Sequence, residues 1–329
     1  MRQVRFARPG SPAEVVEIVE REEPGLSEPD DVLVAIDLFP INPADLLTLQ
    51  GHYPRVDAEA ETLGVEAMGR IEAVGSGVTD LTVGDRVILL SGDNWVERKV
   101  VKSHETIRVP LDADRFASAA LKVNPATAAL LLRFVPLQPG DWIIQNAANS
   151  SVGRAVIQMA AERGLRTVNL VRRADVAAEL QALGADVVLD GEVLRETVMT
   201  ATGGVEPRLA LDGVAGASTD RLAACLAPGA TVVVYGAMSG EAVALNPGSL
   251  VFHDVVVRGF WLTRYLATAP RSEIVQLYAD VQRILSRLQA PPKVAAVYPA
   301  DEIKAAVAQA VAAESGAKVF VTFGPDTAI

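Results

Sequence analysis

The stretch Gln145-Asn146-Ala147-Ala148-Asn149-Ser150-Ser151-Val152-Gly153 separates a short apolar run from a longer amphipathic one. Before it, Trp142-Ile143-Ile144 follows the turn pair Pro139-Gly140, which is the pattern of a buried strand. After it, apolar residues recur at spacings of three and four and mark one helical face: Val152, Ala155, Val156, Met159 and Ala160. The residues between strand and helix are small or polar. They predict a turn whose backbone N–H groups meet an anion at a helix start capped by Ser150 or Ser151.

A dinucleotide-binding fold places the residue that reads the ribose roughly 20 residues beyond such a turn. Here the next apolar run, residues 167–171, ends in Arg172 and Arg173. A carboxylate would accept from the 2′-hydroxyl of NAD, whereas two guanidinium groups suit the 2′-phosphate of NADP. The turn lacks the full G-x-G-x-x-G spacing, so two solvated arginines at a strand end remain the alternative. Together the turn and the arginine pair favour NADPH over NADH.

Composition limits the classes of function. At 329 residues and 50% hydrophobic content, the chain has room for about two domains. A formal net charge of −11 argues against a nucleic-acid partner. The single cysteine, Cys225, excludes an intramolecular disulfide and lies in an apolar helical segment, so we expect a buried thiol. No apolar run is long enough for a membrane span or a signal peptide, and we expect a cytoplasmic enzyme without a membrane partner.

Apolar strands and amphipathic helices alternate between about residue 140 and residue 262. The expected strands are 142–145, 167–171, 186–189, 208–212, 230–235 and 251–258. The expected helices are 152–163, 174–183 and 216–227. This rhythm predicts an α/β fold with a mostly parallel sheet covered on both faces, because right-handed crossovers place a helix after each strand.

The first 120 residues show another pattern, with short alternating strands such as 32–36 and 70–74 between glycine and proline turns. That is typical of a small β-barrel or sandwich. Near the end, a helix at 272–290 precedes a strand at 294–298, a helix at 300–313 and a strand at 318–323. We expect this tail to return to the N-terminal domain.

Several motifs resemble the medium-chain dehydrogenase/reductase superfamily over nearly the whole chain. The general ones are Gly64-Val65-Glu66-Ala67-Met68-Gly69 and Gly84-Asp85-Arg86-Val87. More specific ones resemble the mitochondrial-type 2-enoyl thioester reductases and the related quinone oxidoreductases: Asn42-Pro43-Ala44-Asp45, Gln50-Gly51-His52-Tyr53-Pro54, Val123-Asn124-Pro125-Ala126-Thr127-Ala128, and Arg258-Gly259-Phe260-Trp261-Leu262. The resemblance implies a GroES-like β-barrel catalytic domain, residues 1–122 and 288–329. It also implies a Rossmann-type doubly wound NADP-binding domain, residues 123–287.

The resemblance also implies a zinc-free branch. Zinc-dependent members place a histidine where this chain has Val65, and they supply further cysteines. The histidines His52, His104 and His253 have no ligand spacing among them, so no metal site is expected.

The chemistry implied is hydride transfer from NADPH to the β-carbon of a 2-enoyl thioester, with a proton delivered to the α-carbon. Tyr53 matches the proton-donating tyrosine of the reductases. A phenol, with an ordinary pKa of about 10, stays protonated at neutral pH and donates to a developing enolate. The same hydroxyl could instead stabilise the thioester oxyanion. Without the resemblance, Tyr53 would be read as a packing residue.

The cofactor contacts follow from the same resemblance. Asn124 is expected at the ribose or the amide of the nicotinamide, Arg172 and Arg173 at the 2′-phosphate, and Lys318 near the cofactor. The pyrophosphate is expected to contact Asn149, Ser150, Ser151 and Val152. The cleft is expected to be lined by Tyr235, Gly236, Ala237 and Met238. The nicotinamide is expected to be covered by Phe260, Trp261, Leu262 and Thr263. For the aromatic side chains, core packing is the alternative.

Two departures limit what the resemblance implies. Ala174 stands where relatives often carry a further arginine, and the loop 89–95 is shorter than its counterparts. An NADPH-dependent quinone or enone reductase therefore remains an alternative, as does a cofactor-binding, crystallin-like structural protein. The net charge favours small thioesters, enones or quinones over an acidic carrier protein. The valine-rich strand expected at 251–258 would form a sheet edge, and we expect a homodimer through it.

Overall fold

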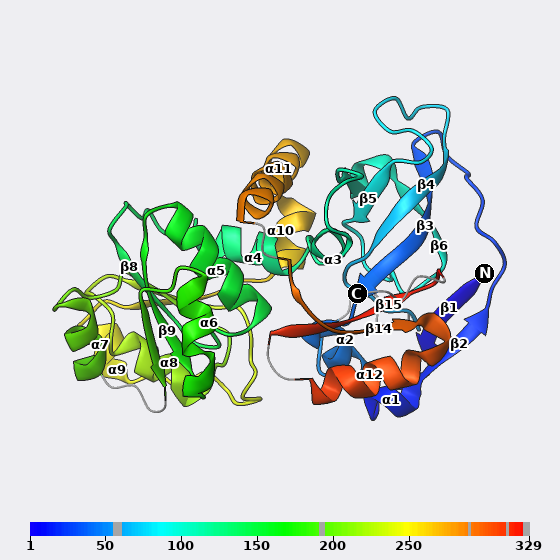
Figure 1. Cartoon of the computed structure of the whole chain (residues 1–329). Helices are drawn as coiled ribbons and strands as arrows, with labels where there is room; N and C mark the ends of the chain where they lie inside the picture. Colours follow the sequence, from blue (N-terminus) through cyan, green and yellow to red (C-terminus); the bar gives the residue numbers. More distant parts are fainter. Residues whose placement is uncertain (55–60, 191–194, 289–290, 314–315, 325–329) are drawn as a thin grey trace. The chain divides into compact units, whose positions relative to one another are not determined.

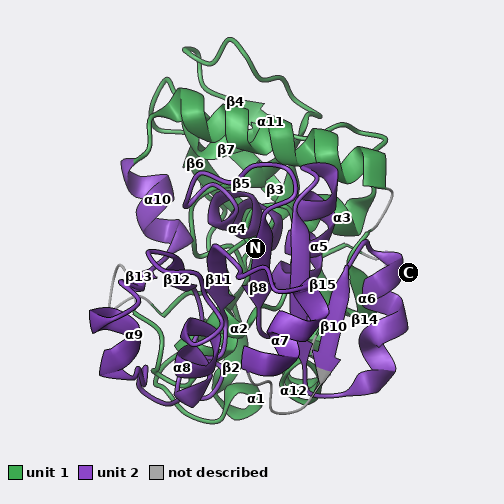
Figure 2. Cartoon of the chain, turned by 90° about the vertical axis from the view of Figure 1, so that its left-hand side faces the viewer, with its two compact units in different colours: residues 1–123, 269–329 green, residues 124–268 purple. Residues whose placement is uncertain are grey.

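The chain forms two compact units in a computed structural model. Unit 1 comprises residues 1–123 and 269–329, and unit 2 comprises residues 124–268 (Figure 2). The structure describes residues 1–54, 61–190, 195–288, 291–313 and 316–324. Each unit has its own buried apolar core.

Unit 2 is built on a six-stranded, wholly parallel sheet with the order β10-β9-β8-β11-β12-β13. The strands are β8 (Trp142–Gln145), β9 (Arg166–Val171), β10 (Val187–Asp190), β11 (Leu209–Asp212), β12 (Thr231–Val234) and β13 (Val256–Gly259). Counted along the chain this is the order 3-2-1-4-5-6 of a doubly wound dinucleotide fold. The predicted fold class is confirmed. The order reverses between β8 and β11, and ligands of such sheets bind at the carboxyl ends of the strands there.

Helices cover both faces of this sheet. One core packs side chains of α7 (Arg195–Thr202) and α8 (Ala217–Ala223) against it, and a second core contains side chains of α5 (Ser151–Glu162) and α6 (Ala177–Ala182). Figure 1 shows α5 and α6 on one side of β8 and β9 and α7 on the other. The remaining helices of unit 2 are α4 (Asn124–Leu131), η2 (Ala174–Val176), α9 (Pro247–Val251) and α10 (Leu262–Thr268).

The strand predicted at 251–258 is wrong over its first half. Val251 ends helix α9, and the strand begins only at Val256. The helix starts at Pro247, which has the fixed φ of a first helical residue, and the Asn246 side chain caps it by accepting the Gly248 N–H. The apolar periodicity of the valine-rich run does not show that Asn246 and Pro247 start a helix there. Cys225, as expected, is buried, and burial raises the pKa of its thiol to about 11.

Unit 1 contains a seven-stranded sheet in which β14-β15-β3-β4-β5-β7 are neighbours and β6 also pairs with β3. These strands are β3 (Asp31–Pro40), β4 (Met68–Val74), β5 (Arg86–Leu89), β6 (Arg98–Lys102), β7 (Thr106–Arg108), β14 (Lys293–Pro299) and β15 (Ala317–Thr322). A separate hairpin joins β1 (Arg2–Phe6) to β2 (Val16–Glu20). The helices are α1 (Pro12–Val15), α2 (Pro43–Leu49), η1 (Ser103–Glu105), α3 (Arg115–Ala119), α11 (Arg271–Leu288), η3 (Ala300–Glu302) and α12 (Ile303–Ala312).

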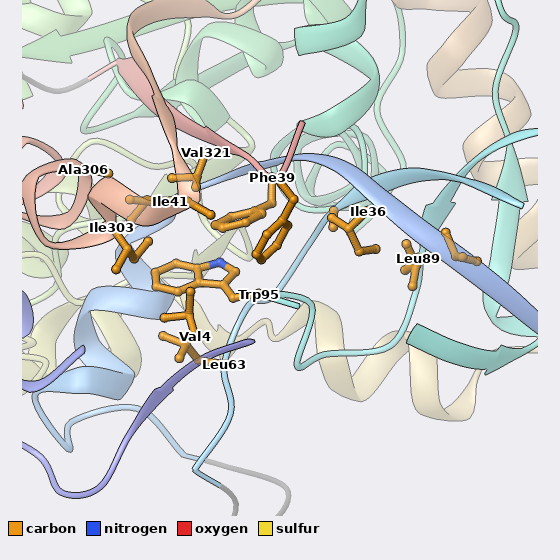
Figure 3. Packing of buried hydrophobic residues seen from close by; sticks show 14 of the residues in the cluster. Val4, Ile36, Phe39, Ile41, Leu63, Leu89, Trp95, Ile303, Ala306 and Val321 are labelled. Atoms are coloured by element: carbon orange, nitrogen blue, oxygen red, sulfur yellow. The ribbon is translucent and has the colours of Figure 1, made fainter. Parts of the chain in front are cut away.

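The core of unit 1 joins residues from both ends of the chain. Trp95 stacks on Phe39 with ring centroids 5.2 Å apart, and Val321 and Ile303 from the C-terminal segment lie in the same cluster (Figure 3). The tail enters the sheet because β15 pairs antiparallel with β3, with Phe320 opposite Pro40 and Val321 opposite Phe39. The expected return of the tail is therefore confirmed.

The second part of unit 1 begins at Ala269 in the structure, whereas the sequence predicted that the second part of the catalytic domain begins at residue 288. The difference is helix α11, whose side chains bond unit 1. The Tyr278 hydroxyl donates to the Lys122 carbonyl (2.9 Å), and Arg271 donates to the Thr106 carbonyl (2.7 Å). Within the described ranges, no helix is long and apolar enough to cross a membrane.

Candidate functional site

Most of the predicted cofactor-binding residues follow the carboxyl ends of parallel strands in unit 2. The segment 149–152 follows β8, the arginine pair follows β9, 235–238 follows β12 and 260–263 follows β13. Because parallel strands end at the same edge of a sheet, these four segments share that edge. Asn124 lies elsewhere in the unit, at the first position of α4.

The turn after β8 presents backbone donors at a helix start. Ser150 is the N-cap of α5, and its hydroxyl accepts a hydrogen bond from the Gly153 N–H (3.1 Å). Across the described parts of the chain, nothing accepts from the N–H groups of Ser151 and Val152. Two unpaired donors at the positive end of a helix suit a phosphate oxygen.

Gly153 makes this turn possible, and the sequence reading did not single it out. A Cβ on Gly153 would lie 2.6 Å from the Ala148 oxygen and 2.7 Å from the Ala147 oxygen. The turn therefore folds closely over the first turn of α5, and only glycine leaves room for it. The Gln145 side-chain amide links this turn of α5 to β9, because it donates to the Gly153 carbonyl (3.0 Å) and to Asn169 Oδ1 (2.8 Å).

A buried polar network holds the ends of β8 and β11 at the point where the strand order reverses. Asn146 donates to the carboxylate of Asp212 (2.6 Å), which is fully buried, and accepts from the Gly213 N–H (2.7 Å). The other carboxylate oxygen accepts from the Thr219 hydroxyl (2.6 Å). The network makes this edge rigid. Sequence reasoning missed it because Asn146 and Asp212 are 66 residues apart.

The segment after β12 also approaches this edge closely. The Tyr235 hydroxyl is buried beside Ser150, with no partner of good hydrogen-bond geometry in the described structure. Burial raises its pKa, and Asp212 adds to the rise, so the hydroxyl stays a donor. A Cβ on Gly236 would lie 2.7 Å from the Gly213 oxygen. Ala237 and Met238 are exposed.

Arg172 and Arg173 are both exposed just beyond the last residue of β9. The Arg173 Nε lies 3.2 Å from Asp175 Oδ1. The Asp175 carboxylate thus lies beside the arginine pair predicted to bind the 2′-phosphate, and the sequence analysis did not consider this neighbour. Both partners are open to solvent, so their attraction is screened and weak.

The aromatic segment and Asn124 differ in burial. Leu262 is buried, but Trp261 is 39% exposed, which argues against core packing for the indole. Phe260 packs edge-to-face on Phe134, with centroids 6.4 Å apart. The Asn124 Nδ2 is buried and has no hydrogen-bond partner among the described residues. A buried donor without a partner costs free energy unless a ligand supplies the acceptor.

Tyr53 lies in unit 1, just beyond helix α2. The Gly51 N–H donates to the Thr48 carbonyl (3.0 Å), and the His52 N–H donates to the Leu47 carbonyl (2.8 Å). Gly51 has a φ of +77°, a conformation that favours glycine. Tyr53 follows directly and is half-buried.

Lys318, on β15, is buried with its ammonium 2.6 Å from Asn42 Oδ1 and 3.8 Å from Glu66 Oε1. Asn42 Nδ2 donates to the same Glu66 oxygen (2.9 Å). The other Glu66 oxygen accepts from the Val123 N–H (2.9 Å). Lys318 therefore takes part in a closed network of unit 1.

Asp45 extends this network through the first turn of α2. Its carboxylate accepts from the N–H groups of Asn42 (2.8 Å) and Val65 (3.0 Å). Burial raises the pKa of Asp45 to about 7, with the nearby Glu66 adding to the rise. Burial likewise lowers the pKa of Lys318, against the pull of Glu66 and Asp45. Of this network only Lys318 was predicted from the sequence as a site residue, whereas Asn42, Asp45 and Glu66 entered only as parts of family motifs.

Lys122 ties the neighbouring segments together. Its buried ammonium donates to the carbonyls of Val65 (2.5 Å) and Ser91 (2.8 Å), and burial lowers its pKa to about 8. Lys99 donates to Asn94 Oδ1 (3.2 Å) and to the Gly92 carbonyl. The short loop 89–95 is therefore held by two ammonium groups.

Comparison with known proteins decides the family. The model for the zinc-binding dehydrogenase family matches residues 151–280, and that for the alcohol dehydrogenase GroES-like domain matches residues 28–106. The mitochondrial enoyl-[acyl-carrier-protein] reductase of Dictyostelium discoideum is 36% identical over 298 residues, 88% of this chain and 85% of the relative. The chain belongs to the medium-chain dehydrogenase/reductase superfamily.

Two further relatives agree. The human mitochondrial enoyl-[acyl-carrier-protein] reductase is 40% identical over 274 residues, covering 80% of this chain and 73% of the relative. The crystal structure of a putative NADPH:quinone reductase from Bacillus thuringiensis superposes with a TM-score of 0.89 at 27% identity, covering 98% and 99% of the two chains. The protein is thus an oxidoreductase of this superfamily. Although one family description names zinc, no group of three or more His, Cys, Asp or Glu placed to hold a metal occurs within the described ranges.

Replacement of Gly153 with alanine tests the phosphate turn. The added Cβ would meet the Ala148 oxygen at 2.6 Å, so the turn must move. We expect NADPH binding to be weaker by about fivefold to 150-fold in a fluorescence titration, because such overpacking typically costs about 1–3 kcal/mol. Gly25→Ala is the control, since nothing lies within 4 Å of an added Cβ there. Equal affinity in both variants would contradict the assignment.

Proposed function

We propose that this protein reduces the C=C bond of 2-enoyl thioesters with NADPH. The observation that carries the proposal is 36–40% identity to mitochondrial enoyl-[acyl-carrier-protein] reductases over 80–88% of the chain. Bound NADPH would supply the hydride that adds to the β-carbon of the conjugated thioester. The α-carbon then needs a proton, and the chain must provide it.

Tyr53 is the proposed proton donor. Its hydroxyl belongs to a half-buried residue, held next to the end of α2 by the bonds of Gly51 and His52. A phenol is a suitable acid for a developing enolate at neutral pH. The same hydroxyl would also stabilise the negative charge that develops on the thioester oxygen.

The proposed cofactor contacts fit several features of unit 2. The unpaired N–H groups of Ser151 and Val152 would bind the pyrophosphate, with Asn149 and Ser150 beside them. Arg172 and Arg173 would bind the 2′-phosphate, and the orphaned Asn124 amide would meet the nicotinamide. Two segments would line the site: Tyr235, Gly236, Ala237 and Met238; Phe260, Trp261, Leu262 and Thr263. A cofactor contact by Lys318 stays a prediction, since the acceptors found for its ammonium are Asn42 and Glu66.

A second candidate is NADPH-dependent reduction of quinones or enones. The superposition on a putative NADPH:quinone reductase favours it. Both reactions deliver a hydride to a conjugated carbonyl compound, so a dinucleotide site serves either. The identity of the acceptor, thioester or quinone, is what separates the two candidates.

We also propose that the protein is a homodimer joined at the edge strand β13. This strand ends the sheet of unit 2 and so leaves one row of backbone groups unpaired within it. Exposed apolar side chains lie on and just before it: Leu250, Val251, Phe252 and Val256. Phe252 is 83% exposed, which is unusual for a phenylalanine that has no partner in solution.

Replacing Tyr53 with phenylalanine tests the proposed reaction. Loss of the acid should lower turnover of crotonyl-CoA by about 10²–10⁴ with little change in NADPH affinity. Tyr298→Phe is the matched control, because Tyr298 lies in the same unit and bonds Gln309. Wild-type kcat/KM is compared for crotonyl-CoA, crotonyl-carrier protein, a small quinone and a 2-alkenal. Preference for the quinone, or unchanged turnover in Tyr53→Phe, would count against enoyl reduction.

Replacing both Arg172 and Arg173 with alanine tests the choice of cofactor. Loss of two charge-assisted contacts should weaken NADPH binding by about 30-fold or more and spare NADH. Calorimetric titration with each cofactor measures this. Arg283→Ala, on the exposed face of α11, is the control. An equal loss for NADPH and NADH would show that the pair does not read the 2′-phosphate.

Light scattering at micromolar concentration tests the assembly. We expect the mass of a dimer for the wild type and that of a monomer for Phe252→Asp, because a buried charge opposes association. Phe252 is exposed in the single chain, so the substitution should leave the fold intact. A monomeric wild type would disprove the dimer.

A further inference from the structure

The first turn of α2 is anchored by side chains that come from distant parts of unit 1. Lys318 of β15 and Glu66, which precedes β4, meet at Asn42, the residue that begins the helix. Asp45 joins that turn to the backbone of Val65. Residues separated by up to 276 positions thus hold one helix start.

This anchor exceeds what a helix start requires. The Asp45 carboxylate already accepts from the Asn42 N–H (2.8 Å), and the Asp45 N–H donates to the Asn42 carbonyl (3.0 Å), so this turn is closed without Glu66 or Lys318. Glu66 and Lys318 are added behind it, 0% and 5% exposed. Such buried pairs contribute little net stability because desolvation offsets their attraction, but they fix the geometry of the groups that they join. The Glu66–Lys318 pair therefore fixes where α2 begins.

Helix α2 transmits this position to Tyr53. It has seven residues, a length of about 10 Å at the α-helical rise. At its far end the N–H groups of Gln50, Gly51 and His52 all donate back to carbonyls of the helix. Tyr53 follows immediately, so a shift of α2 moves the tyrosine with it.

We propose that Asn42, Asp45, Glu66 and Lys318 form a positioning network for Tyr53. This proposal rests on the proposed function, in which Tyr53 donates a proton. Proton donation needs the hydroxyl within hydrogen-bond reach of the acceptor, and a misplacement of about 1 Å can cost about 10²-fold in rate. The network acts on the reaction only through Tyr53 and contributes no proton of its own.

Hydrogen exchange tests the anchor without any reaction. In Lys318→Met the ammonium that bridges Asn42 and Glu66 is lost, so amide exchange over residues 43–54 should be at least about tenfold faster than in the wild type. Lys318→Arg keeps a cation and should restore most of the protection. Lys102→Met is the matched control, because Lys102 lies on β6 of the same unit and the substitution breaks its ion pairs with Asp30 and Asp31. Unchanged exchange in Lys318→Met would overturn the proposal.

A double-mutant cycle with crotonyl-CoA and NADPH tests the route through Tyr53. Lys318→Met alone should lower kcat by about 10-fold or more with NADPH affinity within about threefold of wild type, and Lys318→Arg should recover part of the loss. In a Tyr53→Phe background the same substitution should have almost no further effect, because the hydroxyl that it misplaces is already gone. Additive losses would overturn the proposal. Weakened NADPH binding with additive losses would also overturn it and assign Lys318 to the cofactor.

Two further measurements keep the outcomes distinct. If Lys318→Met does not fold, as judged by circular dichroism, Glu66→Gln replaces it in the exchange experiment and in the cycle. If Tyr53→Phe has no effect on any conjugated substrate, the proposed function fails. The exchange experiment then still decides whether the network anchors residues 43–54.

Discussion

The pairing of β15 with β3 is the constraint on which unit 1 depends. It places Phe320 and Val321 beside Pro40 and Phe39, and so brings the end of the chain into a sheet that begins at residue 31. The apolar cluster around Trp95 and Phe39 then includes residues from both ends of the sequence. The same strand brings Lys318 to Asn42. One strand pairing thus joins the core and the buried polar network.

Unit 2 presents uncharged backbone donors at the carboxyl edge of its sheet, an arrangement that suits an anion. Its parallel sheet brings several carboxyl ends to one edge, and the reversal of strand order opens a place there for a ligand. The turn after β8 offers N–H groups at a helix start, and Gly153 allows the backbone to fold closely enough. The Asn146–Asp212 network, bonded to Gly213 and Thr219, keeps the edge rigid.

The two units therefore offer complementary chemistry for an oxidoreductase of this superfamily. Backbone donors and exposed arginines in unit 2 suit a phosphate-bearing cofactor. In unit 1, charged groups are buried and paired, which fixes positions at a cost in desolvation. A proton donor benefits from such fixed geometry more than from added binding energy, because the rate of proton transfer depends steeply on distance.

The sequence by itself determined the α/β class, the turn after β8, the arginines beyond β9 and the return of the tail, because each shows in short-range periodicity or in a local motif. The strand prediction failed at Val251, because Asn246 and Pro247 start a short helix just before the valine-rich run and Val251 belongs to that helix. Only the tertiary structure decided that α11 packs on unit 1, that Gly153 lies against the Ala148 carbonyl and that Lys318 bonds Asn42. These contacts join residues whose separation along the chain carries no periodic signal. Their existence follows from strand pairing and close packing, which are fixed only when the whole unit folds.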